Sequence, residues 1–260
     1  MRIALGVEYN GAYYSGWQIQ SHCPSVQEDI EKALSIIADS DINQSQIAGR
    51  TDKGVHATAQ VMHFDTDVAR PLSAWVNGTN RYLEQQHISI LWAKQLNEDF
   101  HARFCARRRR YRYILLNRDV RPAILSKLVS WENRPLELDR MIAASKYLLG
   151  EHDFNAYRTV HCQSNNPVKT IYELDIHQDG SYYYFDIEAN AFLHHMVRNI
   201  VGVLCAIGYN DKEPEWAKEV LDSKDRCQGG KTASGEGLYL VRIGYDKDYG
   251  FPQQAIIPSF

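Results

Sequence analysis

The sequence predicts an α+β fold with a mixed, mainly antiparallel sheet flanked by helices. Strand-like and helix-like segments alternate irregularly, unlike the regular alternation of a parallel α/β fold. Two strand-like segments, 169–177 and 181–190, are joined through Asp179-Gly180, a typical hairpin turn. Each half of the chain also runs strand, helix, strand, helix, strand, which suggests a duplicated unit although no sequence repeat is visible.

The first half begins with a predicted strand over residues 3–9, which ends at the turn signal Asn10-Gly11. A loop rich in aromatic residues and glycine follows. Ser25 and Glu28 then have the spacing of a capping box that opens a helix. The helix has one apolar stripe, at Val26, Ile30, Ala33, Leu34 and Ile37. The remaining elements predicted here are a strand over 56–64, a helix from Pro71 to 83 and a strand over 88–94.

The second half begins with an arginine-rich strand over residues 107–117. The elements predicted after it are a helix over 138–150 with Gly150 as its C-cap, the hairpin, a long helix from about Ala191, a short helix over 215–221 and a strand over 237–245. No low-complexity linker separates the halves. We therefore predict two domains that share one continuous interface. The first, 1–105, contains Asp52, and the second, 106–260, contains the arginine-rich strand and Arg198.

The composition is that of an ordinary soluble protein. The chain has 260 residues, of which 44% are hydrophobic and 23% charged, which suits one large domain or two small ones. No apolar run approaches the roughly 18 residues that a membrane span needs. Glu8 comes too soon for the apolar core of a signal peptide. We therefore expect a cytoplasmic protein.

Cysteine and histidine usage predicts neither disulfides nor a metal site. The chain has five cysteines and no C-x-x-C, and an odd count argues against a disulfide framework. His194-His195 is the tightest histidine pair, and no carboxylate or cysteine stands at ligand spacing beside it.

Positive charge is concentrated in one stretch of a chain whose net charge is -3. Between Arg103 and Arg121 there are eight arginines and one acid, Asp119. At strand periodicity the arginines and tyrosines separate onto two faces, one with Arg107, Arg109, Tyr111 and Tyr113, the other with Arg108, Arg110 and Arg112. Arginines that bind phosphates beside rings that stack on bases favour a nucleic-acid surface. The alternative is a charged edge strand that prevents aggregation.

The segment "GRTDKGVHA", residues 49–57, places Asp52 between a nearby arginine and a lysine, in a loop bounded by two glycines. Nearby positive charge keeps a carboxylate ionised, and an ionised aspartate can act as a nucleophile or a base. Gly49 and Gly54 allow a substrate to approach the backbone closely. The alternative is an ordinary Asx-type turn, since Asp and Gly are common in turns.

The helix "AFLHHMVRNIVGVLCAIG" has one broad apolar arc and an unusual opposite arc. The opposite arc has no lysine or glutamate and consists of His194, His195, Arg198, Asn199 and Gly202 with Ala191, Cys205 and Ala206. This pattern predicts a helix that is packed on both sides, with Arg198 inserted into a site. A buried arginine needs an anionic partner, for which Asp52 is a candidate. The alternative is a surface arginine beside small residues.

Four motifs give the sequence a family resemblance. "GRTDKGVHA", "FHARF" with "RRYRY", "NAFLHHMVRN" and "EGLYL" occur in this order in the tRNA pseudouridine synthase A (TruA) family. The resemblance extends from "ALGVEYNGAYYSGWQ" to the final strand, which is nearly the whole chain. Four specific motifs in order favour a catalytic Asp52 over a simple turn.

The resemblance implies a fold and an activity. Members of this family look like two fused ferredoxin-like, or RRM-like, halves that share one extended sheet, and they act as homodimers. They are cofactor-free isomerases that convert uridine to pseudouridine in tRNA, at positions 38, 39 and 40 of the anticodon stem-loop. We therefore expect tRNA as the partner, a homodimer, no cofactor and no membrane association.

The resemblance also implies the roles of individual residues. Asp52 is the expected nucleophile, Tyr111 stacks on the target base, and Arg198 pairs with the aspartate. Arg50 holds or displaces the flipped nucleotide, and Leu238 in "EGLYL" lines the pocket.

Two further expectations concern the basic residues. Arg107, Arg108, Arg109 and Arg110 are the expected RNA-binding residues, by the reasoning for a basic patch. Lys53 stands where many relatives have alanine, and the sequence gives it no firm role.

Two rival functions remain from the residues alone. "VMHFDTDVA" resembles the apolar strand and D-x-D of haloacid dehalogenase-type phosphatases, but His63 interrupts the apolar run and the later acidic pair of such enzymes is missing. A non-catalytic RNA-binding module would need the arginine-rich strand but not Asp52. Formation of pseudouridine in tRNA without metal distinguishes the isomerase from both.

Overall fold

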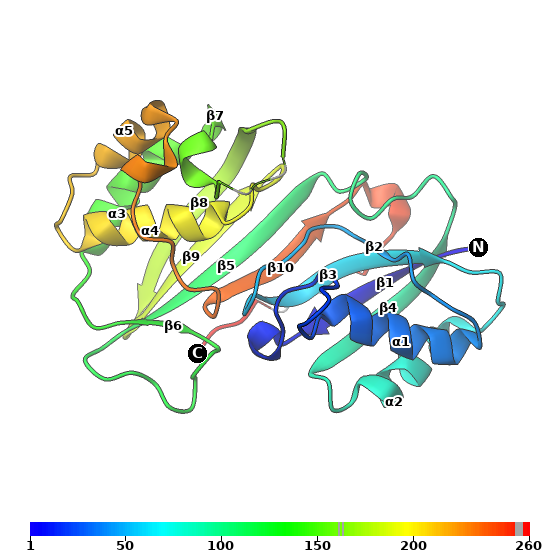
Figure 1. Cartoon of the computed structure of the whole chain (residues 1–260). Helices are drawn as coiled ribbons and strands as arrows, with labels where there is room; N and C mark the ends of the chain where they lie inside the picture. Colours follow the sequence, from blue (N-terminus) through cyan, green and yellow to red (C-terminus); the bar gives the residue numbers. More distant parts are fainter. Residues whose placement is uncertain (161, 163, 253–256) are drawn as a thin grey trace. The chain divides into compact units, whose positions relative to one another are not determined.

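The computed structural model describes residues 1–160, 162, 164–252 and 257–260. The chain divides into two compact units, whose elements are labelled in Figure 1. Unit 1 consists of Met1–Arg107 and Tyr239–Ile257, and unit 2 consists of Arg108–Leu238 and Pro258–Phe260. The chain thus leaves unit 1, builds unit 2 and returns to unit 1 with its last long strand.

In unit 1 the strand β1 lies between β4 and β3. The strands are β1 (Arg2–Tyr9), β2 (Gln46–Ile47), β3 (His56–Asp65), β4 (Ile88–Leu96) and β10 (Leu238–Gly244), of which β10 belongs to this unit from Tyr239 on. β1 is antiparallel to both neighbours, and β2 pairs antiparallel with β3. β10 is parallel to β3, with Tyr239 opposite His56.

The helices α1 and α2 of unit 1 lie together with the turn η2 on one side of its strands (Figure 1). α1 spans Val26–Ala38, α2 spans Thr79–Leu83 and η2 spans Ala74–Gly78, and the unit also contains the short helical turns η1 (Gly11–Tyr13) and η6 (Lys247–Tyr249). α1 begins at the predicted cap, where the Ser25 hydroxyl accepts the Glu28 N–H at 3.3 Å. The segment predicted as a helix from Pro71 to 83 is helical from residue 72 and contains the π-helical turn η2.

The segment after β10 completes the core of unit 1. Tyr245, Tyr249 and Phe251 surround the buried ring of Phe100, with ring centroids 5.5, 5.0 and 5.4 Å away. Aromatic side chains bury a large apolar area, so this cluster holds the returning segment on the unit.

Unit 2 is an antiparallel sheet in the order β5-β9-β8-β7, with β6 added in parallel to β5. Its strands are β5 (Arg108–Asn117), β6 (Ser130–Glu132), β7 (Gly150–Asp153), β8 (Val168–Asp179) and β9 (Tyr182–Ala189). Its helices are α3 (Leu138–Ser145), α4 (Met196–Gly208) and α5 (Trp216–Ser223), with the turns η3 (Lys146–Leu148), η4 (Asn155–Tyr157) and η5 (Arg226–Gln228). Gly180 has a φ of 55° in the turn between β8 and β9, as the hairpin signal predicts.

The α+β class and the mainly antiparallel pairing are confirmed. The prediction for the start of α4 is wrong, because the helix begins at Met196 rather than near Ala191. His195 has a φ of 64°, and a left-handed residue cannot belong to a right-handed helix. The side chains before it therefore do not follow the helical wheel, and Phe192 instead contacts the ring of Tyr111. Among the described residues, every helix is too short or too polar to cross a membrane.

A buried histidine in β3 makes the stability of unit 1 depend on pH. His63 is 3% exposed, and its Nδ1 accepts the Ala102 N–H at 3.1 Å. Burial, with the positive charges of Arg2 and His101 nearby, lowers the pKa of His63 to about 4. Protonation of Nδ1 would also break the bond to Ala102, because a protonated imidazole has no acceptor.

We predict that the folded state loses stability as the pH falls from about 6.5 to about 4, partly through His63. The unfolded chain binds a proton on His63 near its ordinary pKa, whereas the folded chain binds it only near 4, so acid favours unfolding. His63→Gln keeps a side-chain acceptor but does not titrate, and we expect a flatter dependence of the free energy of unfolding on pH. Urea unfolding of both proteins across this range measures the difference, with the exposed His22→Gln as control. Equal slopes for the wild type and His63→Gln would contradict the assignment.

Candidate active site

The residues with predicted catalytic chemistry are distributed over both units. Arg50 and Asp52 belong to unit 1, and Tyr111, Arg198 and Leu238 belong to unit 2. Asp52 lies in the loop that connects β2 to β3 and is half-buried, whereas Arg50 and Lys53 are exposed.

Neutral hydrogen bonds from the sheet and the preceding loop hold the backbone around Asp52. The Thr51 hydroxyl and the Tyr9 hydroxyl lie 2.7 Å apart, and the Thr51 carbonyl accepts the Trp17 N–H at 3.1 Å. Two residues before Thr51, the Gly49 carbonyl accepts a bond of 2.8 Å from the side-chain amide of Gln60. These bonds fix both residues that flank Arg50, so the loop has a defined path before it reaches Asp52.

The loop from Gly11 to Gly16 packs against the other side of the Asp52 loop. A Cβ on Gly11 would lie 2.0 Å from the Val55 carbonyl oxygen, so only glycine fits there. Gly16 has a φ of 106°, and a Cβ on it would lie 2.7 Å from the Thr51 carbonyl oxygen. Gly54, with a φ of 78°, donates to the Tyr14 carbonyl at 3.4 Å. Glycine at these positions therefore allows the backbone of the 11–16 loop to contact the backbone of the Asp52 loop directly.

His56 links this arrangement to β10. Its Nδ1 accepts the Gly11 N–H at 3.1 Å, and its ring stacks on Tyr239 with centroids 4.5 Å apart. His56 is 2% exposed, so its role is structural and it is not a surface acid or base.

The phenol of Tyr9, which contacts the Asp52 loop at Thr51, stays neutral. Burial, and further away the negative charge of Asp52, raise the pKa of Tyr9 to about 12, although the bonds to Thr51 and Gln60 act in the opposite direction. The phenol therefore keeps its proton at physiological pH and remains available as a donor.

In unit 2, Tyr111 has a restrained ring on β5. It is 8% exposed, and its ring meets Phe192 edge to face with centroids 5.1 Å apart and an interplanar angle of 90°. Leu238 is 4% exposed at the start of β10, and its N–H donates to the Gly235 carbonyl at 3.0 Å. Both side chains have fixed positions, which a pocket wall requires.

Arg198 is held by the loop that crosses α4. Its Nε donates to the Ala233 carbonyl at 2.8 Å, and Ala233 in turn donates to the Arg198 carbonyl at 3.1 Å. A Cβ on Gly202 would lie 1.9 Å from the Lys231 carbonyl oxygen, so this loop covers the small-residue arc of the helix. The structure thus explains why that arc lacks long charged side chains. The pairing of Arg198 with Asp52 would join the two units and stays a prediction.

The covering loop has its own anchor, which sequence reasoning missed. The Asn199 side chain is 2% exposed and donates to the Tyr157 carbonyl at 2.8 Å. Its oxygen accepts bonds from Arg226 at 3.1 Å and from Thr232 at 2.7 Å. The motif "MVRN" shows an amide residue, Asn199, directly after Arg198. The sequence does not show its hydrogen-bond partners, because they lie far from Asn199 along the chain.

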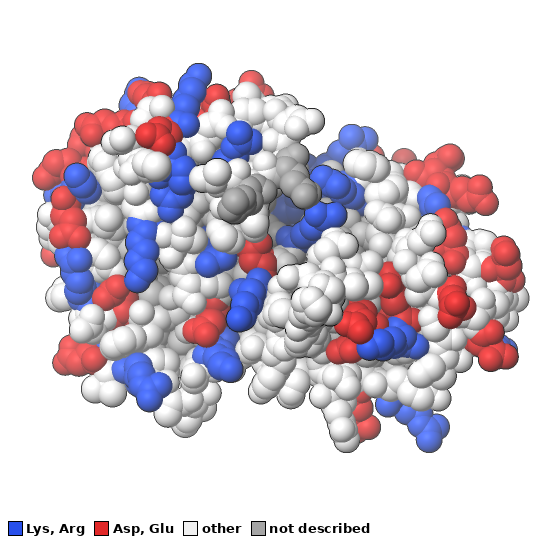
Figure 2. All heavy atoms as spheres, in the orientation of Figure 1, with Lys and Arg blue, Asp and Glu red and all other residues white. Residues whose placement is uncertain are grey.

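The arginines on one face of β5 have structural partners. Arg108 contacts Glu188 at 2.9 Å, Arg110 contacts Glu173 at 2.7 Å, and Arg112 binds both oxygens of Asp186, at 2.9 and 2.6 Å. Asp186 and Glu188 are buried, so the arginines neutralise acids that the fold would otherwise leave unpaired. Figure 2 likewise shows positive and negative side chains intermingled on its visible face.

Arg107 and Arg109 contact an exposed acid and a backbone carbonyl, respectively. Arg107 contacts Asp246 at 3.2 Å while 66% of its side chain remains exposed, and Arg109 donates to the Asn190 carbonyl at 2.8 Å. Exposed ion pairs contribute little to stability, so Arg107 can exchange its partner at low cost.

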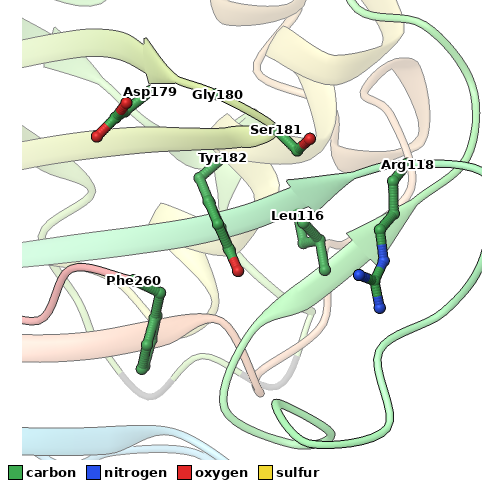
Figure 3. Close-up of a pocket in the computed structure, with 7 residues that line it drawn as sticks. All are labelled: Leu116, Arg118, Asp179, Gly180, Ser181, Tyr182 and Phe260. Atoms are coloured by element: carbon green, nitrogen blue, oxygen red, sulfur yellow. The ribbon is translucent and has the colours of Figure 1, made fainter.

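Two other features of unit 2 do not contain predicted site residues. A hollow of about 280 Å³ at the hairpin end is lined by Leu116, Arg118, Asp179, Gly180, Ser181, Tyr182 and Phe260 (Figure 3). Asp175, His177 and Asp186 place possible metal-ligand atoms within 4.8 Å of one another. Because Arg112 occupies both oxygens of Asp186, this cluster is an ion pair with neighbours and not an open cation site.

Comparisons with known proteins agree with the sequence motifs. A family model described as tRNA pseudouridine synthase matches residues 144–246. The chain is 50% identical over 260 residues to a Vibrio campbellii protein named tRNA pseudouridine synthase A, covering 100% of this chain and 98% of the relative. Proteins of the same name from Coxiella burnetii, 50% identical over 259 residues, and Tolumonas auensis, 51% identical over 258 residues, cover 100% and 99% of this chain and 98% of each relative.

We predict that Gly11→Ala destabilises the protein by about 1–3 kcal/mol, because the methyl group meets backbone that must move. Chemical denaturation measures the loss. Gly78→Ala is the matched control, because its Cβ would meet only the end of the flexible Ile37 side chain. Equal stability of the two variants would mean that the backbone at Val55 moves at little cost to make room for a side chain at residue 11.

Proposed function

The chain belongs to the tRNA pseudouridine synthase A family, and we propose that it isomerises uridine to pseudouridine in tRNA with Asp52 as its nucleophile and without a cofactor. The observation that carries the proposal is the position of Asp52 on a loop held from two sides, in a motif of a family that the chain matches over its whole length. A reacting group must be held in a narrow range of positions, and this loop meets that requirement.

The reaction suits a single carboxylate. The C1′–N1 bond of the nucleotide breaks, C1′ joins C5 of the same base, C5 loses its hydrogen as a proton, and N1 gains a proton. No electrons enter or leave, and no group is added, so the atom balance requires no redox cofactor. The carboxylate of Asp52 attacks C6 or C1′, or removes a ribose proton, and the residues are compatible with each of these routes.

The remaining site residues support binding of an extruded base. The ring of Tyr111 is restrained by Phe192 and offers a stacking surface for the target uracil, and the buried, apolar Leu238 lines the pocket. Arg198 pairs with Asp52 and keeps it ionised, and Arg50 holds the displaced nucleotide. Extrusion of a base costs a few kcal/mol, which stacking and phosphate contacts offset.

The proposed substrate position is the anticodon stem-loop, at nucleotides 38, 39 and 40, and the proposed assembly is a cytoplasmic homodimer. The family relationship supports both. A dimer would also double the basic surface of a chain whose net charge is -3.

Among the proposed RNA-binding residues, Arg107, Arg108, Arg109 and Arg110, the exposed ones are the better phosphate ligands. Arg107 and Arg108 are 66% and 55% exposed, whereas 21% of the Arg110 side chain is exposed. An exposed guanidinium can reach a phosphate, and Arg107 can do so without leaving a buried carboxylate unpaired, because its partner Asp246 is itself exposed.

We predict that Asp52→Asn abolishes pseudouridine formation and leaves tRNA affinity within about twofold of the wild type, since the amide keeps the shape but is not a nucleophile. The assay incubates purified protein with tRNA and a chelator, followed by detection of pseudouridine by mass spectrometry of nucleosides. Asp67→Asn, an exposed aspartate of the same unit, is the control. Turnover by Asp52→Asn near the wild-type rate would refute the role of Asp52.

We predict that Arg198→Lys lowers the rate at saturating tRNA by about tenfold or more, because lysine lacks the planar fork that pairs with a carboxylate. Arg121→Lys, an exposed position of unit 2, should leave the rate unchanged. A normal rate for Arg198→Lys would exclude a fork-specific pairing with Asp52.

A further inference from the structure

An exposed aromatic pair stands beside the Asp52 loop and has no role in the site described above. Tyr13, at the end of η1, is 55% exposed. Its ring stacks on His87 with centroids 4.0 Å apart and an interplanar angle of 10°. Stacking covers one face of the Tyr13 ring, and its exposure leaves area for another flat group.

The backbone under this pair is held in place. The Asn10 N–H donates to the His87 carbonyl at 3.0 Å, and the Asn10 side chain accepts the Ala12 N–H at 3.0 Å. The Tyr14 hydroxyl donates to the Gln86 carbonyl at 2.6 Å, just before His87. The two loops that carry the rings are therefore joined on both sides of the pair, which limits the entropy lost when a ligand binds.

The pair is close to Asp52 within the same unit. Gly11 contacts Val55, the Tyr14 carbonyl accepts the Gly54 N–H, and Gly16 packs on Thr51. Tyr13 lies between the first two contacts, so its backbone is on the order of 10 Å from that of Asp52, counting residues of 3.8 Å each. One RNA strand with a nucleotide at Asp52 would pass Tyr13 within one or two nucleotides.

Charge and chemistry favour a nucleobase as the ligand. Arg50 and Lys53 are exposed on the same loop and supply positive charge for the phosphates of a passing strand. Extrusion of the target uridine also leaves its neighbours without a stacking partner. A flat aromatic surface replaces that partner without reading the sequence, since every base has a π-face.

We infer that Tyr13 and His87 form a stacking platform for a nucleobase that neighbours the target uridine. The inference rests on the proposed function. It makes Tyr13 a positioning residue, which binds the strand and does not touch the reacting atoms, and it makes Lys53 a phosphate ligand beside the platform.

The test compares Tyr13→Leu, which removes the ring, with Tyr13→Trp, which keeps a stacking surface. For pseudouridine formation we expect Tyr13→Leu to raise KM about tenfold, the range for loss of one base stack, with little change in kcat. Tyr13→Trp should retain the wild-type KM. Tyr82→Leu, an exposed tyrosine of α2 at 50%, is the matched control and should behave as the wild type. Tyr13→Gln serves as a second ring-free variant, and thermal unfolding checks that each variant folds.

A second readout detects stacking directly. Stem-loop RNAs with 2-aminopurine on the 5′ or the 3′ side of the target uridine are bound to Asp52→Asn protein, with and without Tyr13→Leu. We expect quenching of one of the two probes that depends on Tyr13. An active wild type whose KM and quenching are unchanged in Tyr13→Leu and Tyr13→Gln would overturn the platform. A fall in kcat and in melting temperature, with KM unchanged, would show that the ring only supports the fold. An inactive wild type would refute the proposed function itself.

Discussion

The contact between Gly11 and the Val55 carbonyl is the constraint on which the candidate site depends. A side chain at residue 11 would push apart two loops that otherwise touch along Gly11, Gly16 and Gly54. Because these loops touch, the hydrogen bond from Gly11 to His56 can form, and His56 in turn stacks on Tyr239 of the returning strand. The local geometry of Asp52 is thus determined by small residues and neutral contacts that belong to a single unit.

A second constraint is the neutralisation of buried acids in unit 2. Asp186 lies on β9 directly opposite its partner Arg112 of β5, and Glu188 is paired by Arg108, two residues from the register position opposite it. The arginine-rich strand therefore balances buried acids within its own unit, whatever else it binds. Part of its charge balances the sheet, and only the remainder is available to a polyanion. Counting arginines in the sequence overestimates the charge that an RNA strand would meet.

Local features were predictable from the sequence, and long-range partners were not. The Ser25 cap and the Asp179-Gly180 turn depend on neighbouring residues, and both predictions are correct. The start of α4 was missed because the left-handed conformation of His195 has no local signature in a histidine. The acidic partners of Arg108, Arg110 and Arg112 were missed because they lie 63 to 80 residues away along the chain. The motif identified Asp52, but not Tyr9 and Gln60, which support its loop from other strands.

The support of the Asp52 loop has a consequence for how the carboxylate can act. The bonds that hold the neighbouring backbone come from Tyr9, Trp17 and Gln60, none of which is charged, and burial keeps the Tyr9 phenol protonated. A scaffold of neutral groups does not depend on the charge of Asp52 for its integrity. Under the proposed function, these bonds would persist while the carboxylate loses its charge in a covalent step and regains it afterwards. If Asp52 is the nucleophile, bonds among neutral neighbouring groups suit it, because they are unaffected when the carboxylate is consumed and regenerated.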